Sequence, residues 1–87
     1  MNRKIIFVEK SREQLIQLSA EQPKLIKRIF ELIENIDRTP FEGIGKPEPL
    51  KYQLKGKWSR RINEEHRLVY EVNNTEIIIY ACKFHYD

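Results

Sequence analysis

Hydrophobic and polar positions follow two different periods along this chain, and the change of period separates helical from extended segments. Ile5–Val8 is a short run of β-branched and aromatic residues, which predicts a buried strand. Between Pro23 and Pro40, apolar residues recur every three or four positions, as on one face of an α-helix. They are Ile26, Ile29, Phe30, Ile33 and Ile36. This pattern predicts a helix that starts near Pro23, where a missing N–H is tolerated, and ends before Pro40.

A shorter helix is predicted ahead of this one. Ser11 and Gln14 have the spacing of a capping box, in which each side chain satisfies a backbone N–H of the first helical turn. We therefore expect Ser11 to cap a helix that runs to about Ala20, with Leu15 and Leu18 facing inward. The two helices would form a hairpin that covers one face of a sheet.

The second half of the chain has the pattern of strands and turns. Two glycines and two prolines make 41–50 a loop with a restricted backbone. The predicted strands are Trp58–Ile62, His66–Val72 and Glu76–Phe84, with Tyr52–Leu54 as a further short strand that turns at Gly56. Asn73-Asn74 would form a tight turn, because Asn tolerates positive φ. The order predicts a single α+β domain over residues 1–87: a strand, a helix hairpin, and an antiparallel sheet packed against the helices.

The register of the first two long strands decides where their charges lie. A three-residue loop, Glu64–His66, would pair Arg61 with Val69 and place Arg61 and Arg67 on the face opposite Leu68. A two-residue loop would bring Arg67 to the apolar face. Because the hydrophobic pattern fixes register, we predict the three-residue loop.

Composition is that of an ordinary globular protein, with 87 residues, 40% hydrophobic and 33% charged. No apolar run has the length of a membrane span, and the first residues lack the apolar stretch of a signal peptide. The single cysteine, Cys82, lies in an apolar strand and is typical of a core residue. These features favour a cytoplasmic protein without membrane contact.

Positive charge is concentrated in the middle of the chain. Seven basic and three acidic residues lie between Lys46 and Arg67, an excess of four, whereas the whole chain has a net charge of +3. Such an excess is typical of a phosphate-binding face and also of a solvated hairpin, and charge alone leaves both open.

One set of residues could cleave RNA without a metal. The 2′-OH can attack the neighbouring phosphorus if a base removes its proton, an acid protonates the leaving 5′-oxygen, and positive charge stabilises the transition state. Glu48, His85 and Arg67 have these chemistries, and each also has an ordinary structural explanation. His66 competes with His85 for the histidine role, but its place beside two glutamates at a strand start favours a structural part.

Metal and cofactor chemistry have little support in the sequence. Two histidines and one cysteine give no zinc-like spacing. Gly43-Ile-Gly45 lacks the Lys-Ser/Thr partner of a phosphate-binding loop. We therefore expect no metal and no cofactor.

Four ordered motifs resemble the YoeB/Txe family of bacterial toxins, part of the RelE/ParE superfamily. They are R-T-P-F-E-G-x-G-K-P-E-P-L at Arg38–Leu50, W-S-R-R-I at Trp58–Ile62, E-E-H-R-L-V-Y at Glu64–Tyr70 and A-C-K-F-H-Y at Ala81–Tyr86. The resemblance covers the full chain and implies a RelE-like fold. This chain departs from the family by continuing to Asp87 after the His-Tyr pair, and by carrying Tyr52 where some relatives have histidine.

The resemblance implies a ribosome-dependent, metal-independent endoribonuclease that cuts mRNA in the A site and inhibits translation. It assigns the general base to Glu48, phosphate stabilisation to Arg67, the general acid to His85 and an auxiliary role to Tyr86. The residues expected to bind RNA are Lys46, Lys51 and Arg61.

The resemblance also implies partners. These are a YefM/Axe-type antitoxin that wraps the toxin, the 70S ribosome with its mRNA, operator DNA reached only through the antitoxin complex, and a second toxin copy in a homodimer. Two alternatives stay open: a non-catalytic ParE-type inhibitor of DNA gyrase, and a plain RNA-binding module. The ParE branch lacks the base and the terminal His-Tyr pair, both of which are present here.

Overall fold

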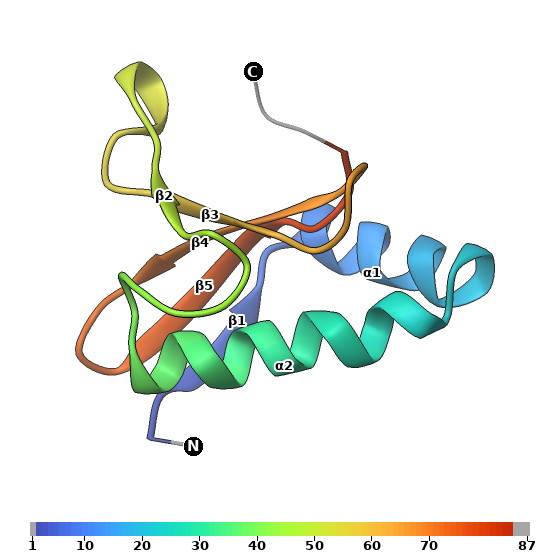
Figure 1. The fold of residues 1–87 in the computed structure, drawn as a ribbon, viewed down its shortest axis with the longest axis horizontal. Coiled ribbons are helices and arrows are strands. Elements are labelled where there is room, and N and C mark those ends of the chain that lie inside the picture. The colour runs from blue at the N-terminus through green and yellow to red at the C-terminus, as the bar shows by residue number, and fades with distance from the viewer. Residues whose placement is uncertain (1, 85–87) are drawn as a thin grey trace.

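A five-stranded mixed sheet with two helices on one face forms the protein (Figure 1). The computed structural model describes residues 2–84. Its elements are β1 (Lys4–Phe7), α1 (Glu9–Glu21), α2 (Lys24–Arg38), β2 (Glu48–Pro49), a 3₁₀ turn (Tyr52–Leu54), β3 (Trp58–Arg61), β4 (Arg67–Val72) and β5 (Glu76–Ala81). The strand order is β1-β5-β4-β3-β2, in which β1 runs parallel to β5 and every other pair is antiparallel. The α+β, RelE-like prediction is confirmed.

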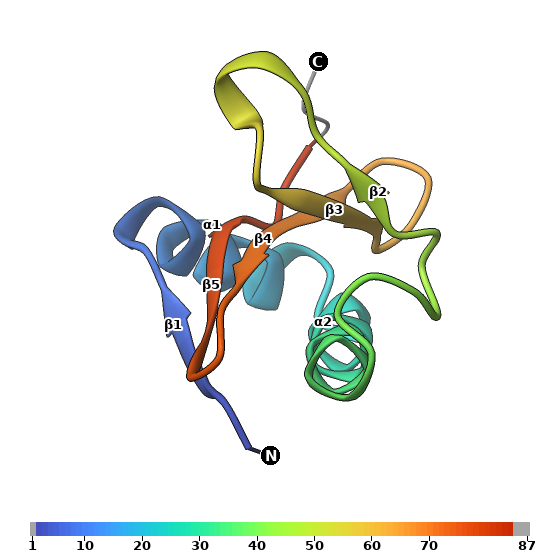
Figure 2. The same ribbon diagram turned by 90° about the vertical axis from the view of Figure 1, so that its left-hand side faces the viewer.

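The core lies between the helices and one face of the sheet, and within residues 2–84 no helix covers the other face (Figure 2). Leu18 of α1 and Ile29, Ile33 and Ile36 of α2 pack against buried strand residues, as the helical period predicts. Phe30 was expected on this stripe but is 41% exposed, and Leu32 is buried instead. Phe30 lies at the margin of the layer, where its ring centroid is 6.3 Å from that of Phe7.

The predicted capping box is wrong, because tertiary contacts use both side chains. α1 begins at Glu9, and Ser11 is buried within its first turn. The Ser11 hydroxyl oxygen lies 2.7 Å from the carbonyl oxygen of Ile79 in β5 and 2.8 Å from that of Val8. Gln14 Oε1 accepts the backbone N–H of Cys82 at 2.8 Å. These two side chains therefore attach α1 to β5 and to the segment that follows it.

Two short elements differ from the prediction. Tyr52–Leu54 is a 3₁₀ turn, not a strand, and the edge strand β2 lies inside the expected loop. Prolines on either side of Glu48 suit an edge strand because their missing N–H groups are not needed for pairing. β1 is also an edge strand and only half buried, whereas a buried strand was expected.

The predicted register between β3 and β4 is wrong by two residues. Arg61 pairs directly with Arg67 across a five-residue connection, 62–66. Side chains alternate with a period of two, so this even shift leaves both arginines on the face away from Leu68, as predicted. Buried His66 and the Asn63 side chain, which accepts the His66 N–H at 2.7 Å, belong to the connection and explain its length.

The last strand is shorter than predicted, and the turn before it lies one residue later in the chain. β5 ends at Ala81 instead of Phe84. Asn73 pairs with Glu76, so the turn residues are Asn74 and Thr75, and among the described residues neither Asn has positive φ. The Asn73 side chain instead caps the turn by accepting the N–H groups of Thr75 and Glu76 at 2.9 and 2.8 Å.

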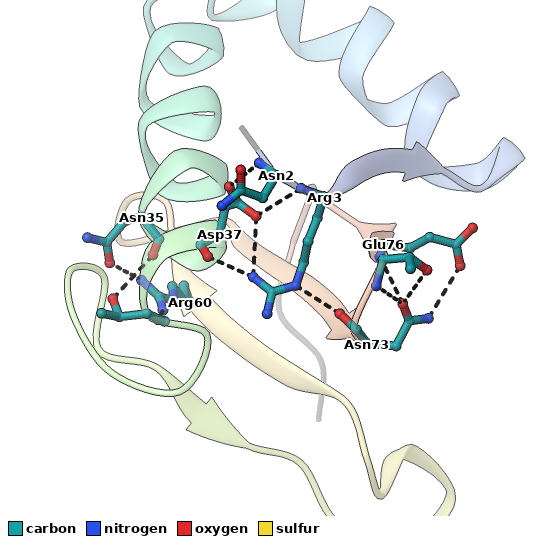
Figure 3. Close-up of polar contacts among 9 residues, drawn as sticks. Asn2, Arg3, Asn35, Asp37, Arg60, Asn73 and Glu76 are labelled. Carbon is teal, nitrogen blue, oxygen red and sulfur yellow. Dashed lines mark hydrogen bonds and ion pairs between the residues drawn. The ribbon is translucent and has the colours of Figure 1, made fainter.

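A polar clamp joins the start of the chain to the end of α2 and to this hairpin (Figure 3). The Arg3 guanidinium donates to the backbone oxygens of Asp37 and Asn73 at 2.7 and 2.8 Å. The Asp37 carboxylate accepts the N–H of Asn2 at 3.0 Å and that of Arg3 at 3.3 Å. These bonds fix the entry into β1.

Candidate functional site

The open face of β2, β3 and β4 carries a cluster of polar side chains. Glu48 pairs with Ser59, Ser59 pairs with Val69, and Arg61 pairs with Arg67. Directly paired residues project to the same face of a sheet. Because Leu68 and Tyr70 face the core, this cluster faces away from both helices.

Glu48 and Arg67 form the centre of the cluster. The Arg67 Nε–H donates to Ser59 Oγ at 3.1 Å, and Nη2 lies 3.6 Å from Glu48 Oε2. The Arg67 side chain is 13% exposed and that of Glu48 is 66% exposed. Nη2 is buried and has no hydrogen-bond partner among residues 2–84. A buried N–H without a partner is unusual, and here it can donate to an anionic oxygen brought in by a ligand.

The backbone on both sides of Glu48 is held in place. The Gly45 carbonyl accepts the backbone N–H of Arg61 at 2.6 Å, and the backbone N–H of Leu50 donates to the Lys57 carbonyl at 2.9 Å. Gly45 has φ +81°, and a Cβ there would lie 2.7 Å from Leu32 Cδ2. Lys46 follows with φ 52°, a conformation that is uncommon outside glycine. Close packing and fixed backbone angles therefore set the position of the backbone from which the Glu48 side chain projects.

Arg60, which the sequence-based search for chemistry did not select, holds the loop that precedes Glu48. Its side chain is fully buried, and all five of its N–H groups are donated. Figure 3 shows the Arg60 guanidinium beside the Asn35 side chain of α2. The acceptors are the side chains of Asn35 and Tyr70 and the backbone oxygens of Thr39, Glu42 and Ile44. Strand alternation in Trp58–Ile62 was the available signal, since it places Arg60 on the core face.

Tyr70 completes this buried network. Its hydroxyl accepts from Arg60 Nε at 3.1 Å and donates to the Pro40 carbonyl at 2.9 Å. Burial raises the pKa of the Tyr70 phenol, while the neighbouring Arg60 opposes that rise. The phenol therefore stays neutral and bridges β4 to the loop.

Comparison with known proteins decides the family. Residues 7–86 match the family described as YoeB-like toxin of bacterial type II toxin-antitoxin system. The chain belongs to the YoeB-like toxins. It is 51% identical to Toxin YoeB of Escherichia coli K12 and 53% identical to Toxin YoeB of Synechocystis. Each alignment spans 83 residues and 95% of this chain, and covers 99% and 96% of the respective relatives.

Solved structures agree with the assignment of this YoeB-like toxin. A YoeB dimer from Staphylococcus aureus superimposes with a TM-score of 0.93 at 46% identity, covering 99% of this chain and 100% of that one. A heterotetrameric YoeB-YefM toxin-antitoxin complex from the same organism gives 0.89 with the same identity and coverage. The resemblance seen in the motifs is therefore confirmed.

The other predicted site residues surround the cluster or lie outside the described residues. Lys46 and Lys51 flank β2 and are exposed, and exposed Arg61 lies beside Arg67. His85, Tyr86 and Asp87 fall outside residues 2–84. His66 is 1% exposed and bonded to the protein backbone, which fits the structural part expected for it.

Three further features bear on the site. Within residues 2–84, no group of three or more His, Cys, Asp or Glu side chains could hold a metal ion. Burial raises the pKa of the Cys82 thiol to about 11, so this cysteine stays protonated in the core. Neither of the described helices has the length and apolar character needed to cross a membrane.

Proposed function

We propose that this YoeB-like toxin is a ribosome-dependent endoribonuclease, an mRNA interferase that cuts mRNA in the A site and inhibits translation. The observation that carries the proposal is the Glu48 carboxylate 3.6 Å from Nη2 of the largely buried Arg67 guanidinium, since Nη2 has no hydrogen-bond partner among residues 2–84. A base and an anion-binding donor so close together suit attack on a phosphodiester.

In the proposed reaction, Glu48 removes the proton of a ribose 2′-OH. The 2′-oxygen bonds to phosphorus, and the bond to the 5′-oxygen breaks. Arg67 stabilises the charge that develops on the non-bridging oxygens, since its guanidinium is held in advance by Ser59. His85, with Tyr86 as an auxiliary, protonates the leaving 5′-oxygen. The products are a 2′,3′-cyclic phosphate and a 5′-OH, and no step uses a metal or a cofactor.

The exposed basic residues around the cluster suit a phosphate backbone. Lys46, Lys51 and Arg61 lie on either side of Glu48 and Arg67 and are exposed. We propose that they contact mRNA, which would make binding sensitive to salt.

The proposed partners follow from the relatives. We infer a YefM-type antitoxin, as in the S. aureus heterotetramer, and a homodimer, as in the S. aureus dimer. Operator DNA would be reached only through the antitoxin complex, and the site of action would be the cytoplasm, where the 70S ribosome translates.

The test uses purified protein, programmed 70S ribosomes and mapping of mRNA 5′ ends. We expect the wild type to cut in the A site, and Glu48→Gln and His85→Gln to lose cutting. Glu31→Gln, which removes the same charge from an exposed position of α2, is the matched control and should cut normally.

If the wild type does not cut mRNA, the proposal is contradicted, and two further assays identify the alternative. Inhibition of DNA gyrase in a supercoiling assay would favour a ParE-type toxin. Salt-sensitive RNA binding without cutting would favour a plain RNA-binding module.

A further inference from the structure

The segment after β5 is attached to α1 residue by residue. Gln14 accepts the N–H of Cys82 at 2.8 Å. Lys83 Nζ lies 3.1 Å from Glu21 Oε1 and 3.0 Å from Gln17 Oε1. The polar side of α1 thus fixes the path of the chain as it leaves the sheet.

Phe84, the last described residue, has a strained backbone. Its φ is 65°, in the left-handed region that bulky side chains rarely adopt. Such a conformation is unfavourable for a bulky side chain and persists only where surrounding contacts hold it. Side-chain burial is not the cause here, because Phe84 is 54% exposed.

Both backbone groups of Phe84 are bonded to neighbouring residues of the β3–β4 connection and β4. Its N–H donates to His66 Nδ1 at 2.8 Å, and its carbonyl accepts the N–H of Arg67 at 3.2 Å. The rings of His66 and Phe84 are also in contact, with centroids 5.5 Å apart. These contacts account for the strained conformation.

The His66 ring is buried, and both of its nitrogens contact other residues of the protein. It is 1% exposed, Nδ1 accepts the Phe84 N–H at 2.8 Å, and Nε2 lies 3.4 Å from Glu65 Oε1. Because Nδ1 accepts a backbone N–H, the proton of the neutral ring is on Nε2. The ring is therefore occupied with protein contacts and cannot itself protonate an RNA oxygen.

We infer that His66 is a positioning residue for the general acid: by holding Phe84, it fixes the backbone from which His85 follows directly in sequence. This inference rests on the proposed function, in which His85 protonates the leaving 5′-oxygen. Through the Phe84 carbonyl and the Arg67 N–H, the same contacts tie the acid-bearing segment to the phosphate-binding arginine. If the His66 side chain only filled space in the core, the position of Phe84 would not depend on its Nδ1 acceptor.

The first test measures the Phe84 amide and does not depend on catalysis. In His66→Asn the side-chain oxygen can replace Nδ1 as acceptor, whereas His66→Leu has no acceptor. We expect hydrogen exchange of the Phe84 amide to become at least about tenfold faster in His66→Leu and to stay slow in His66→Asn. Unchanged exchange in His66→Leu would overturn the inference. If the leucine variant does not fold, His66→Gln, whose oxygen reaches the Nε2 position instead, takes its place.

The second test asks whether the loss acts through the acid. Replacing the scissile 5′-oxygen of the ribosome-bound mRNA by sulfur gives a leaving group that needs no proton: the P–S bond breaks and its electron pair stays on sulfur. We expect His66→Leu and His85→Ala to lower the single-turnover rate at least about tenfold on the oxygen substrate only, with unchanged half-saturating concentration. Glu48→Gln should be slow on both substrates, and His66→Asn should be close to wild type.

The outcomes separate this inference from the proposed function. His66→Leu that is equally slow on both substrates, or as fast as wild type on the oxygen substrate, would overturn the positioning role. A wild type that cuts neither substrate would overturn the proposed function, and the Phe84 exchange would still decide whether His66 holds the segment.

Discussion

At the scale of single residues, the central pair joins an exposed carboxylate, Glu48, to a largely buried guanidinium, Arg67. Glu48 Oε2 lies 3.6 Å from Arg67 Nη2, and the Glu48 side chain is largely exposed to water. Ion pairs with an exposed partner contribute only about 0–1 kcal/mol to folding. The arrangement therefore does little for stability, and its significance lies in what it offers to a ligand.

Glu48→Gln tests the acid alone. Removing its charge should change the free energy of unfolding by less than about 0.5 kcal/mol, as for other exposed positions. Loss of a general base should slow mRNA cleavage at least about 100-fold. Urea unfolding and single-turnover cleavage measure the two effects. Unimpaired cleavage would remove Glu48 from the mechanism.

Arg67→Gln tests the guanidinium. Loss of one preorganised charged donor should cost about 3–4 kcal/mol of transition-state stabilisation, by analogy with an oxyanion-hole donor. The readout is the single-turnover rate at saturating ribosome concentration. Arg61→Gln, the directly paired arginine on the same face, is the control and should affect binding more than rate. Equal rate losses in the two variants would argue against a special role for Arg67.

At the scale of elements, the loop between α2 and β2 is organised by a buried cation. Arg60 donates to three backbone oxygens of residues 39–44 and to Asn35 of α2. A flexible surface loop would leave the position of Glu48 loose, whereas this one is attached to the core at several points.

Arg60→Met removes all of these bonds while roughly keeping the side-chain volume. Buried acceptors without donors cost about 1–3 kcal/mol each, so we expect at least about 2 kcal/mol of destabilisation. Urea unfolding measures it, with exposed Arg61→Met as the matched control at less than about 0.5 kcal/mol. Similar unfolding midpoints for the two variants would contradict this account of the loop.

The elements also show what the sequence could and could not predict. The α2 stripe was predictable because burial of Ile29, Ile33 and Ile36 follows directly from helical geometry. Ser11 and Gln14 were misassigned because their partners, Ile79 and Cys82, are 68 residues away in the chain. No local pattern contains such contacts.

The candidate site was also predictable only in part, because local patterns fix which face a strand residue occupies but not its long-range contacts. Residue chemistry and strand parity brought Arg61 and Arg67 to one face, even though the exact pairing was wrong by two residues. Ser59, which holds Arg67, and Arg60, which holds the loop, were missed. Strand alternation could have placed Arg60 on the core face, but the partners of both residues lie on other segments of the chain and are not visible in the sequence.

At the scale of the whole molecule, the clamp of Arg3 and Asp37 joins the start of the chain to the end of α2 (Figure 3). It lies beside β1, the edge strand at the opposite side of the sheet from β2. The N–H of Asn2, more than the Arg3 guanidinium, holds the pKa of Asp37 below its ordinary value of 3.8. A carboxyl group whose pKa is lower in the folded than in the unfolded state stabilises the fold at pH values above its unfolded pKa. That stabilisation is lost as the pH falls through the folded pKa.

Asp37→Asn should therefore flatten the acid limb of the stability curve. We expect the wild-type urea midpoint to fall as pH is lowered from neutral to below 3.8, and the variant's midpoint to fall less. Glu31→Gln, which removes an exposed carboxyl of α2 that takes no part in the clamp, is the control. Identical pH dependence in Asp37→Asn and wild type would show that the clamp carries no such linkage.

If the sheet face that carries Glu48 and Arg67 activates a ribose 2′-OH, cleavage must depend on that hydroxyl. The substrate is an mRNA on 70S ribosomes in which a single 2′-OH, next to the scissile phosphate in the A site, is replaced by hydrogen. We predict that wild-type toxin cuts the unmodified mRNA to leave a 2′,3′-cyclic phosphate and does not cut the 2′-deoxy mRNA at that bond. Cutting of both mRNAs at the same rate would contradict the account.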